Sequence, residues 1–254
     1  MLDSLIATVD LTGTELLILT GITLIAGIVR GFSGFALSAI VMASAVIILP
    51  PVALIPVCWW LEMTASALMT RDGWAEADRG VVAGLVIGST VGVPFGLMLT
   101  TSVPVETSKL IALAVIIVLA LTQLARIRLR FLATRPGLYG SGLLAGIVTG
   151  LASVGGMVIA VYVLSQDAPA AKMRAALVLF LFFSAITSMI TLVWFGIMDA
   201  TAVARGLAFA VPTAAGVMIG QRLFVPALTR FYRRFCLVLL CTLACASLIR
   251  TVTS

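Results

Sequence analysis

Histidine is absent from this chain of 254 residues, and charged residues are scarce, at 10% of the total. A water-soluble domain has about a quarter of its residues charged, which lets it cover its surface. Apolar residues make up 62%, and the mean hydropathy is +1.23, so lipid is the environment that accounts for the composition. At about 20 apolar residues per spanning helix, we predict an all-α polytopic membrane protein of roughly eight to ten segments, without a soluble domain.

The missing residue types also exclude several classes of enzyme. Without histidine, neither an HExxH zinc protease nor a Ser–His dyad can form. No pair of aspartates occupies an apolar run, which excludes an intramembrane aspartyl protease. The four cysteines form no CxxC pair and are interpreted as small packing residues; they are Cys58, Cys236, Cys241 and Cys245. We therefore expect no enzyme, no metal and no cofactor.

The net charge of +6 is not arranged as a nucleic-acid-binding face. Lys and Arg lie in short stretches between apolar runs, without interleaved aromatic residues, so no nucleic-acid partner is expected. Near the N-terminus, Asp3, Asp10 and Glu15 stand where a signal peptide would carry basic residues. We expect the first apolar segment to serve as its own signal.

Apolar runs follow one another in the same order in the two halves of the sequence. Each half begins with an interrupted run, at 15–49 and at 138–165, and continues with three uninterrupted runs. These lie at about 53–70, 80–99 and 107–125 in the first half, and at about 174–196, 203–221 and 235–250 in the second. An Arg-rich stretch at 126–135 separates the halves.

Short sequence similarities relate the two halves. LIAGIVRG at 24–31 matches LLAGIVTG at 143–150, and GSTVGVPFG at 88–96 aligns with PTAAGVMIG at 212–220. Weak internal similarity is typical of transporters built from repeats, although coincidence between Gly-rich helices is the alternative. We predict two repeats, 1–135 with the Arg-rich loop and 136–254. Each would have an interrupted or re-entrant helical hairpin followed by three transmembrane helices.

Charge predicts how the two halves are oriented. With five segments per half, four loops fall on one side and hold 12 of the 16 Lys and Arg residues; they are 71–79, 126–135, 165–174 and 222–234. Because Lys and Arg resist translocation, we predict that this side, with the Arg-rich loops 126–135 and 222–234, is the cytoplasmic side of a bacterial inner membrane. An odd number of segments per half makes the second repeat inverted relative to the first.

The two interrupted runs carry the first candidate site. A helix broken inside the membrane leaves N–H groups and a partial positive charge at the start of its second part. Such an end can bind an oxyanion, and irregular backbone at this depth has to be covered by protein or water. The candidate residues are Gly31, Ser33 and Gly34 in the first half and Gly150, Ser153, Gly155 and Gly156 in the second. Close helix packing is the alternative role of the glycines.

Two charged residues in apolar surroundings extend this site. Glu62 lies well inside an apolar run, where an unpaired carboxylate is costly, so it is either a proton carrier or gate, or the partner of Arg30 or of nearby hydroxyls. Arg30 directly precedes the first break. It either clamps an anionic substrate in bidentate fashion or extends to the interface as a topology marker.

Hydroxyl side chains follow two later segments. Ser184, Thr187, Ser188 and Thr191 are spaced to share one helical face. The candidates for lining the substrate path are Ser89, Thr90, Ser184, Thr187 and Ser188. Interhelical hydrogen bonding is their alternative role.

The sequence around the two breaks resembles a known family. GIVRGFSGFALSAIV in the first half, and GIVTGLASVGGMVIAVYVL followed by APAAKMRAALVLFLFFSAITS in the second, are similar to the sulfite exporter TauE/SafE family, also called toluene sulfonate uptake permeases. The likeness extends from about residue 15 to residue 250. It implies transport of sulfur-containing oxyanions such as sulfite, sulfonates or organosulfonates.

These features together predict a secondary transporter that works by alternating access. A small anion would be held near the midplane between the two breaks, and an ion or proton gradient would drive its movement. A passive anion channel, a transporter of a different small organic anion and a scaffold protein are the alternatives. The expected partners are the anion and the lipid bilayer, and the question of a homo-oligomer stays open.

Overall fold

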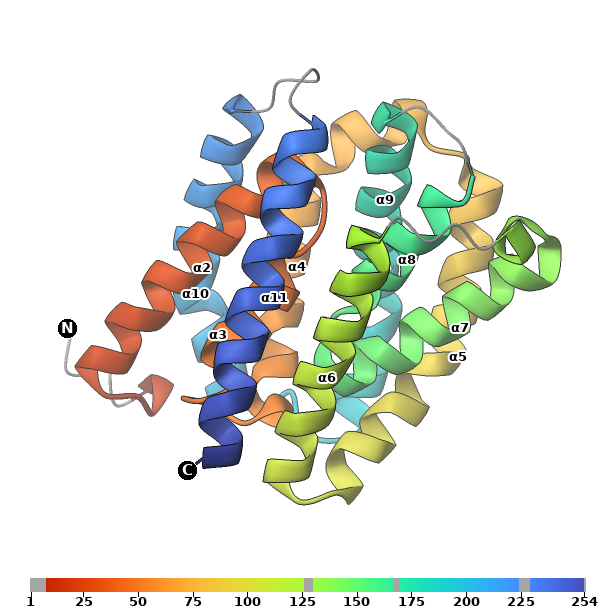
Figure 1. The fold of residues 1–254 in the computed structure, drawn as a ribbon. Coiled ribbons are helices and arrows are strands. Elements are labelled where there is room, and N and C mark those ends of the chain that lie inside the picture. The colour runs from red at the N-terminus through yellow and green to blue at the C-terminus, as the bar shows by residue number, and fades with distance from the viewer. Residues whose placement is uncertain (1–7, 126–129, 167–169, 224–228, 254) are drawn as a thin grey trace.

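The computed structural model describes residues 8–125, 130–166, 170–223 and 229–253, and these ranges are helical, without a strand (Figure 1). The first half contains α2 (Gly13–Ser33), α3 (Leu37–Ala45), α4 (Pro51–Glu76), α5 (Arg79–Ser102) and α6 (Val105–Leu124). After the 3-10 turn η1 (Arg130–Ala133), the second half contains α7 (Arg135–Ala152), α8 (Gly155–Leu164), α9 (Ala170–Trp194), α10 (Ala200–Arg222) and α11 (Thr229–Thr253). The predicted all-α fold is confirmed.

Each half begins with a helix that breaks and turns back, as the sequence predicts (Figure 1). Gly34, in left-handed backbone with φ of 80°, ends α2 and donates its N–H to the carbonyl of Arg30. Ser153, with φ of 58°, ends α7 and donates its N–H to the carbonyl of Thr149. Glycine adopts this backbone without strain, whereas serine does so at some cost. The same kind of turn therefore ends the first helix of both halves.

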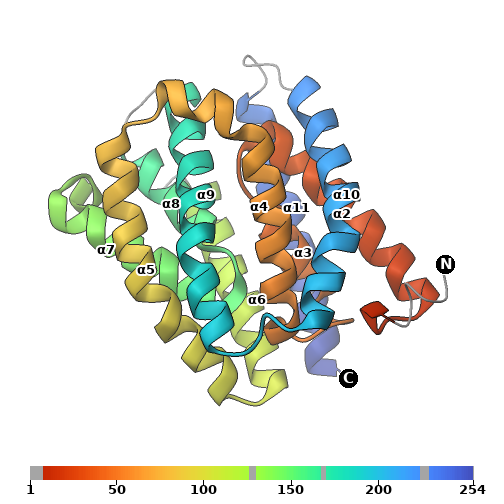
Figure 2. The same cartoon turned by 180° about the vertical axis from the view of Figure 1, so that it is seen from behind.

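The closest helix pairs join one half to the other. α2 packs along α10, α7 packs along α5, α4 lies beside α9, and α6 lies beside α11. Figure 2 shows α4 and α9 in the middle of the molecule, with α5 on one side and α10 on the other. The two halves are therefore interleaved.

Glycines allow the cross-half pairs to approach closely. A Cβ atom at Gly92 of α5 would lie 2.2 Å from the carbonyl oxygen of Leu143 in α7. One at Gly216 of α10 would lie 2.3 Å from the carbonyl oxygen of Leu24 in α2. Both distances are far below van der Waals contact, so these positions need glycine. Because Gly92 aligns with Gly216 and Leu143 with Leu24, the same interface is built twice.

Within the described ranges, seven helices are long and apolar enough to cross a membrane: α2, α4, α5, α6, α9, α10 and α11. The helices that follow the breaks are shorter, with nine residues in α3 and ten in α8. At 1.5 Å per residue, such helices cross only part of a bilayer. The long helices supply the spans, and the short ones return from the breaks.

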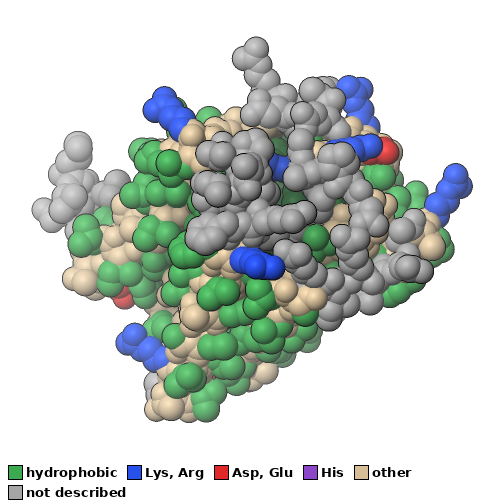
Figure 3. Space-filling model, turned by 45° about the horizontal axis from the view of Figure 1, so that its top comes forward, with side chains coloured by type: hydrophobic (Ala, Val, Ile, Leu, Met, Phe, Trp, Pro, Cys, Tyr) green, Lys and Arg blue, Asp and Glu red, His purple; other side chains and the backbone are tan. Residues whose placement is uncertain are grey.

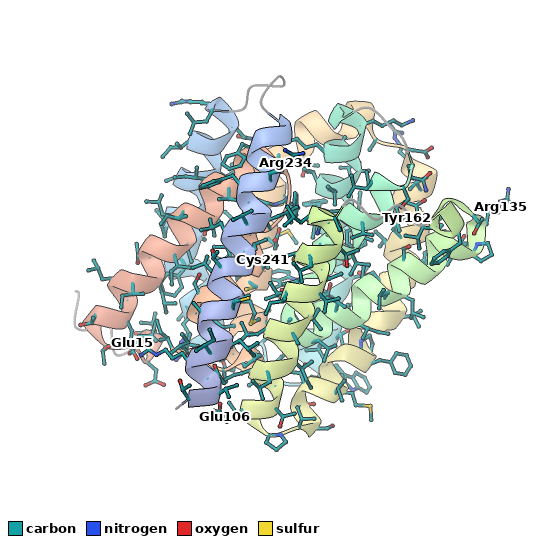
Figure 4. All side chains as sticks on the ribbon, in the orientation of Figure 1. Glu15, Glu106, Arg135, Tyr162, Arg234 and Cys241 are labelled. Carbon is teal, nitrogen blue, oxygen red and sulfur yellow. The ribbon has the colours of Figure 1, made fainter. Side chains whose placement is uncertain are left out.

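Basic side chains surround one end of the helical bundle. Figure 3, which brings the top of Figure 1 forward, shows Lys and Arg side chains around that end and hydrophobic side chains on the flanks. In Figure 4, Arg135 and Arg234 lie toward this end, and Glu15 and Glu106 lie toward the other. We call it the basic end; α5, α9 and α11 begin there. Residues 126–129 and 224–228 of the predicted cytoplasmic loops lie outside the described residues, and the inverted orientation of the repeats stays a prediction.

Candidate functional site

A cavity lies between α4, α5, α7 and α9, beside the second helix break. Its volume is about 40 Å³, enough for a few water molecules. Its polar wall consists of Trp59, Glu62, Thr149, Ser153, Ser184 and Ser188. Its remaining wall consists of Ile55, Val93, Leu97, Gly150, Leu181, Ala185 and Leu192.

The cavity extends from the middle of the bundle toward the end opposite the basic end. α9 begins at the basic end and lines the cavity from Leu181 to Leu192, in its second half. α4 runs the other way and lines it from Ile55 to Glu62, in its first half. Side chains of the second break thus line a cavity that lies away from the basic end.

The second break supplies one side of this cavity. Thr149, Gly150 and Ser153 lie on its wall, and the Thr149 hydroxyl donates a 2.7 Å hydrogen bond to the carbonyl of Ala145. No side chain caps the start of α8, which follows directly after Val154. The partial positive charge of that helix start therefore lies close to the cavity wall.

Hydroxyls of α9 supply the opposite side. Ser184 and Ser188 are buried and line the cavity, with the hydroxyl of Ser184 3.0 Å from that of Ser89 in α5. The Ser188 hydroxyl donates to the carbonyl of Ala185 at 3.1 Å, and the same carbonyl accepts the indole N–H of Trp59 at 2.7 Å. These bonds fix the positions of the polar groups without closing the space between them.

Glu62 connects the cavity with the first break. Its side chain lines the cavity, and its Oε1 accepts hydrogen bonds from the backbone N–H (3.3 Å) and the hydroxyl (2.8 Å) of Ser38. Ser38 lies in the first turn of α3, so the carboxylate stabilises the positive end of that helix. The other carboxylate oxygen, Oε2, lies 3.2 Å from Nε of Arg30. Glu62 therefore forms the ion pair with Arg30 that was one of its two predicted roles.

Arg30 is completely buried, and its guanidinium contacts three groups. It donates hydrogen bonds to the carbonyl of Gly34 and, at 3.0 Å, to the hydroxyl of Ser66, in addition to the ion pair with Glu62. It therefore binds the backbone of the first break directly. Burial excludes the predicted alternative in which Arg30 extends to the membrane interface.

The first break is also covered by Arg174 of α9. Its Nη2 donates a 2.7 Å hydrogen bond to the carbonyl of Gly31. Its side chain also packs against Gly34, where an added Cβ atom would lie only 2.8 Å from the Arg174 Cγ. The Ser33 hydroxyl is used locally, because it donates to the carbonyl of Phe35 at 2.7 Å. Protein side chains thus occupy the first break, while a cavity borders the second.

The predicted site residues lie in three separate places. Gly150, Ser153, Glu62, Ser184 and Ser188 line the cavity. Arg30, Gly31, Ser33 and Gly34 lie at the first break, where Gly31 meets the backbone of α10. Gly155 and Gly156 begin α8 behind the cavity wall, buried against Thr149 and Leu181, and Ser89 lies behind Ser184.

Thr90 and Thr187 lie away from the cavity. Thr90 is exposed on α5 and donates to the carbonyl of Val86, and Thr187 lies on a separate apolar groove between α5 and α9. Sequence reasoning missed Trp59, Thr149 and Arg174 as site residues. A tryptophan in an apolar run or an arginine near a loop gives no local signal of such a role.

The architecture is that of a multi-pass helical membrane protein with two interrupted hairpins. Its sequence matches the Sulfite exporter TauE/SafE family over residues 19–247, nearly the whole chain, and the chain belongs to that family. No curated protein and no solved structure matches it. The family is one of membrane transporters, in keeping with the prediction that the chain is not an enzyme.

Proposed function

We propose that this protein is a secondary transporter of small sulfur-containing oxyanions, such as sulfite or organosulfonates, in a bacterial inner membrane. The observation that carries the proposal is the cavity at the second break, which Ser153, Ser184 and Ser188 line beside the start of α8. Hydroxyl donors and a helix start are groups that bind oxyanions. Family membership supports the choice of sulfur anions.

Alternating access is supported by the two similar breaks. In the proposed cycle, the cavity releases or accepts the anion at the end opposite the basic end. A rearrangement of the interleaved halves then gives access from the basic end, which we assign to the cytoplasm because Lys and Arg gather there. Such rocking about a central site is common to transporters built from repeats.

Glu62 is proposed to couple transport to protons. It is the carboxylate on the cavity wall, and it also bonds to Ser38 and Arg30 at the other break. A carboxylate beside an anion repels it, so uptake of a proton by Glu62 would favour binding of the anion. Protonation would also weaken the ion pair with Arg30, which links the proton to the movement of the first break.

Uptake into proteoliposomes tests the substrate class. We expect saturable uptake of sulfite or of a small organosulfonate, with little uptake of chloride, and a rate that changes when a proton gradient is imposed. Absence of uptake for every sulfur oxyanion, with and without a gradient, would refute the substrate assignment. Uptake that does not saturate and ignores the proton gradient would instead favour the passive anion channel.

A further inference from the structure

Equivalent positions in the two halves are filled by different kinds of side chain. When Gly34 is aligned with Ser153, Thr149 is the counterpart of Arg30. In the same alignment, Leu181 is the counterpart of Glu62. In the same register, Ile55 is the counterpart of Arg174. The cavity at the second break is thus lined by Thr149, Leu181 and Ile55, whose counterparts at the first break are charged.

Contacts around the breaks support this correspondence. A Cβ atom on Gly150 would meet the carbonyl oxygen of Val93 in α5 at 2.5 Å, and one on Gly31 would meet the carbonyl oxygen of Val217 in α10 at 2.4 Å. Glu62 and its counterpart Leu181 also contact the first turn of the short helix that follows each break, at Ser38 of α3 and at Gly156 of α8 respectively.

We infer that Arg30, Glu62 and Arg174 form a gate that closes the basic end of the transport path, and that they fill the counterpart of the anion cavity. Opening this gate would present the guanidinium groups of Arg30 and Arg174 to an anion arriving at the basic end. The space would then be a second anion-binding position, more strongly cationic than the cavity at Ser153. This inference extends the proposed function, because it specifies where the path is closed.

The placement of the three residues suits a gate. Arg30 reaches Gly34 and Ser66, and Arg174 reaches Gly31, so the two arginines join α2, α4 and α9 across the first break. Their contacts with the break are hydrogen bonds, and Arg30 also pairs with Glu62 of α4; such contacts can exchange for bonds to an anion. Arg174 is only partly buried, near the start of α9 at the basic end, whereas Arg30 is fully buried.

Cysteine accessibility tests the gate without relying on transport. A cavity cysteine, Ser188→Cys, is treated with a membrane-impermeant thiol reagent in right-side-out and in inside-out vesicles. Ser102→Cys and Lys172→Cys, both at exposed positions at opposite ends, report which end the reagent reaches. The parent chain with its own four cysteines gives the background. We expect the cavity cysteine to react from the end opposite the basic end and to be protected from the basic end.

The gate is then replaced by the residues of the second half, in the double variant Arg30→Thr/Glu62→Leu. Removing both charges leaves no unpaired buried charge. We expect the cavity cysteine to gain reactivity from the basic end while keeping its reactivity from the other. The control Glu106→Leu/Lys109→Thr removes an exposed ion pair of 2.9 Å and should leave the pattern unchanged.

Continued protection from the basic end in the double variant, with labelling from the other end intact, would overturn the inference. If the double variant does not fold, Arg174→Ile provides the same test at a partly buried position, and continued protection there would equally overturn it. A cavity cysteine that reacts from both ends in the parent chain would also overturn it. Because labelling needs no sulfite, a changed pattern without sulfite uptake would retain the gate and refute only the substrate.

Discussion

Glu62 and Arg30 lie 3.2 Å apart, from Oε2 to Nε, in a part of the protein where Arg30 has no exposed surface. The pair connects α4 with the end of α2, and Glu62 also forms part of the cavity wall. One carboxylate therefore contacts both the buried arginine at the first break and the space at the second. A change in its charge would act on both breaks.

The ion pair predicts an asymmetry between single and double variants. Arg30→Ala leaves the Glu62 carboxylate buried and unpaired, so the protein should lose roughly 3–5 kcal/mol of stability. The double variant Arg30→Thr/Glu62→Leu should lose less than the sum of the two single variants, because both charges disappear together. Thermal unfolding of the detergent-solubilised protein measures both. Additive losses would contradict a direct interaction.

Glu62→Gln predicts a loss of proton coupling together with a loss of stability, because the buried Arg30 keeps its charge but loses the carboxylate that pairs with it. A glutamine carbonyl can still accept the two hydrogen bonds of Ser38, but the side chain no longer binds and releases a proton. We expect sulfite uptake that no longer responds to an imposed pH gradient. Glu106→Gln, at the exposed pair with Lys109, is the control and should respond as the parent chain does. An unchanged response in Glu62→Gln would assign the coupling to another group.

The glycine contacts predict opposite effects of two similar substitutions. Gly92→Ala would place a methyl group 2.2 Å from the carbonyl oxygen of Leu143, forcing α5 and α7 apart at a cost of about 1–3 kcal/mol. Gly140→Ala in α7 meets nothing within 4 Å and should be neutral or stabilise by up to about 1 kcal/mol. Midpoints of thermal unfolding compare the two variants. Equal midpoints would contradict the close packing of the cross-half helices.

The sequence predicted the elements well because apolar length and Gly-rich interruptions are local signals. Both breaks occur where the sequence places them, and Glu62 was identified because a lone carboxylate in an apolar run has to find a partner. The repeat similarity at Gly92 and Gly216 was also visible. It did not reveal that each glycine packs against the opposite half, because a match within one chain does not specify contact partners.

The different roles of Ser33 and Ser153 could not be predicted from the sequence. Treating both breaks alike placed Ser33 and Ser153 in one role, whereas Ser33 bonds to its own turn and Ser153 faces the cavity. The difference depends on Arg174, which lies far along the chain and was interpreted as a topology charge. Its reach to the carbonyl of Gly31 follows from the packing of α9 beside the end of α2.

Sulfite uptake by two matched leucine variants tests the central claim, that the cavity at the second break binds the anion. Ser188→Leu fills the cavity, whereas Thr122→Leu replaces a half-buried hydroxyl on α6 that lies outside this cavity and bonds only within its own helix. Both are measured in proteoliposomes at equal amounts of folded protein. We predict that Ser188→Leu abolishes saturable uptake while Thr122→Leu retains it. Retained saturable uptake in Ser188→Leu would contradict the assignment of this cavity as the anion site.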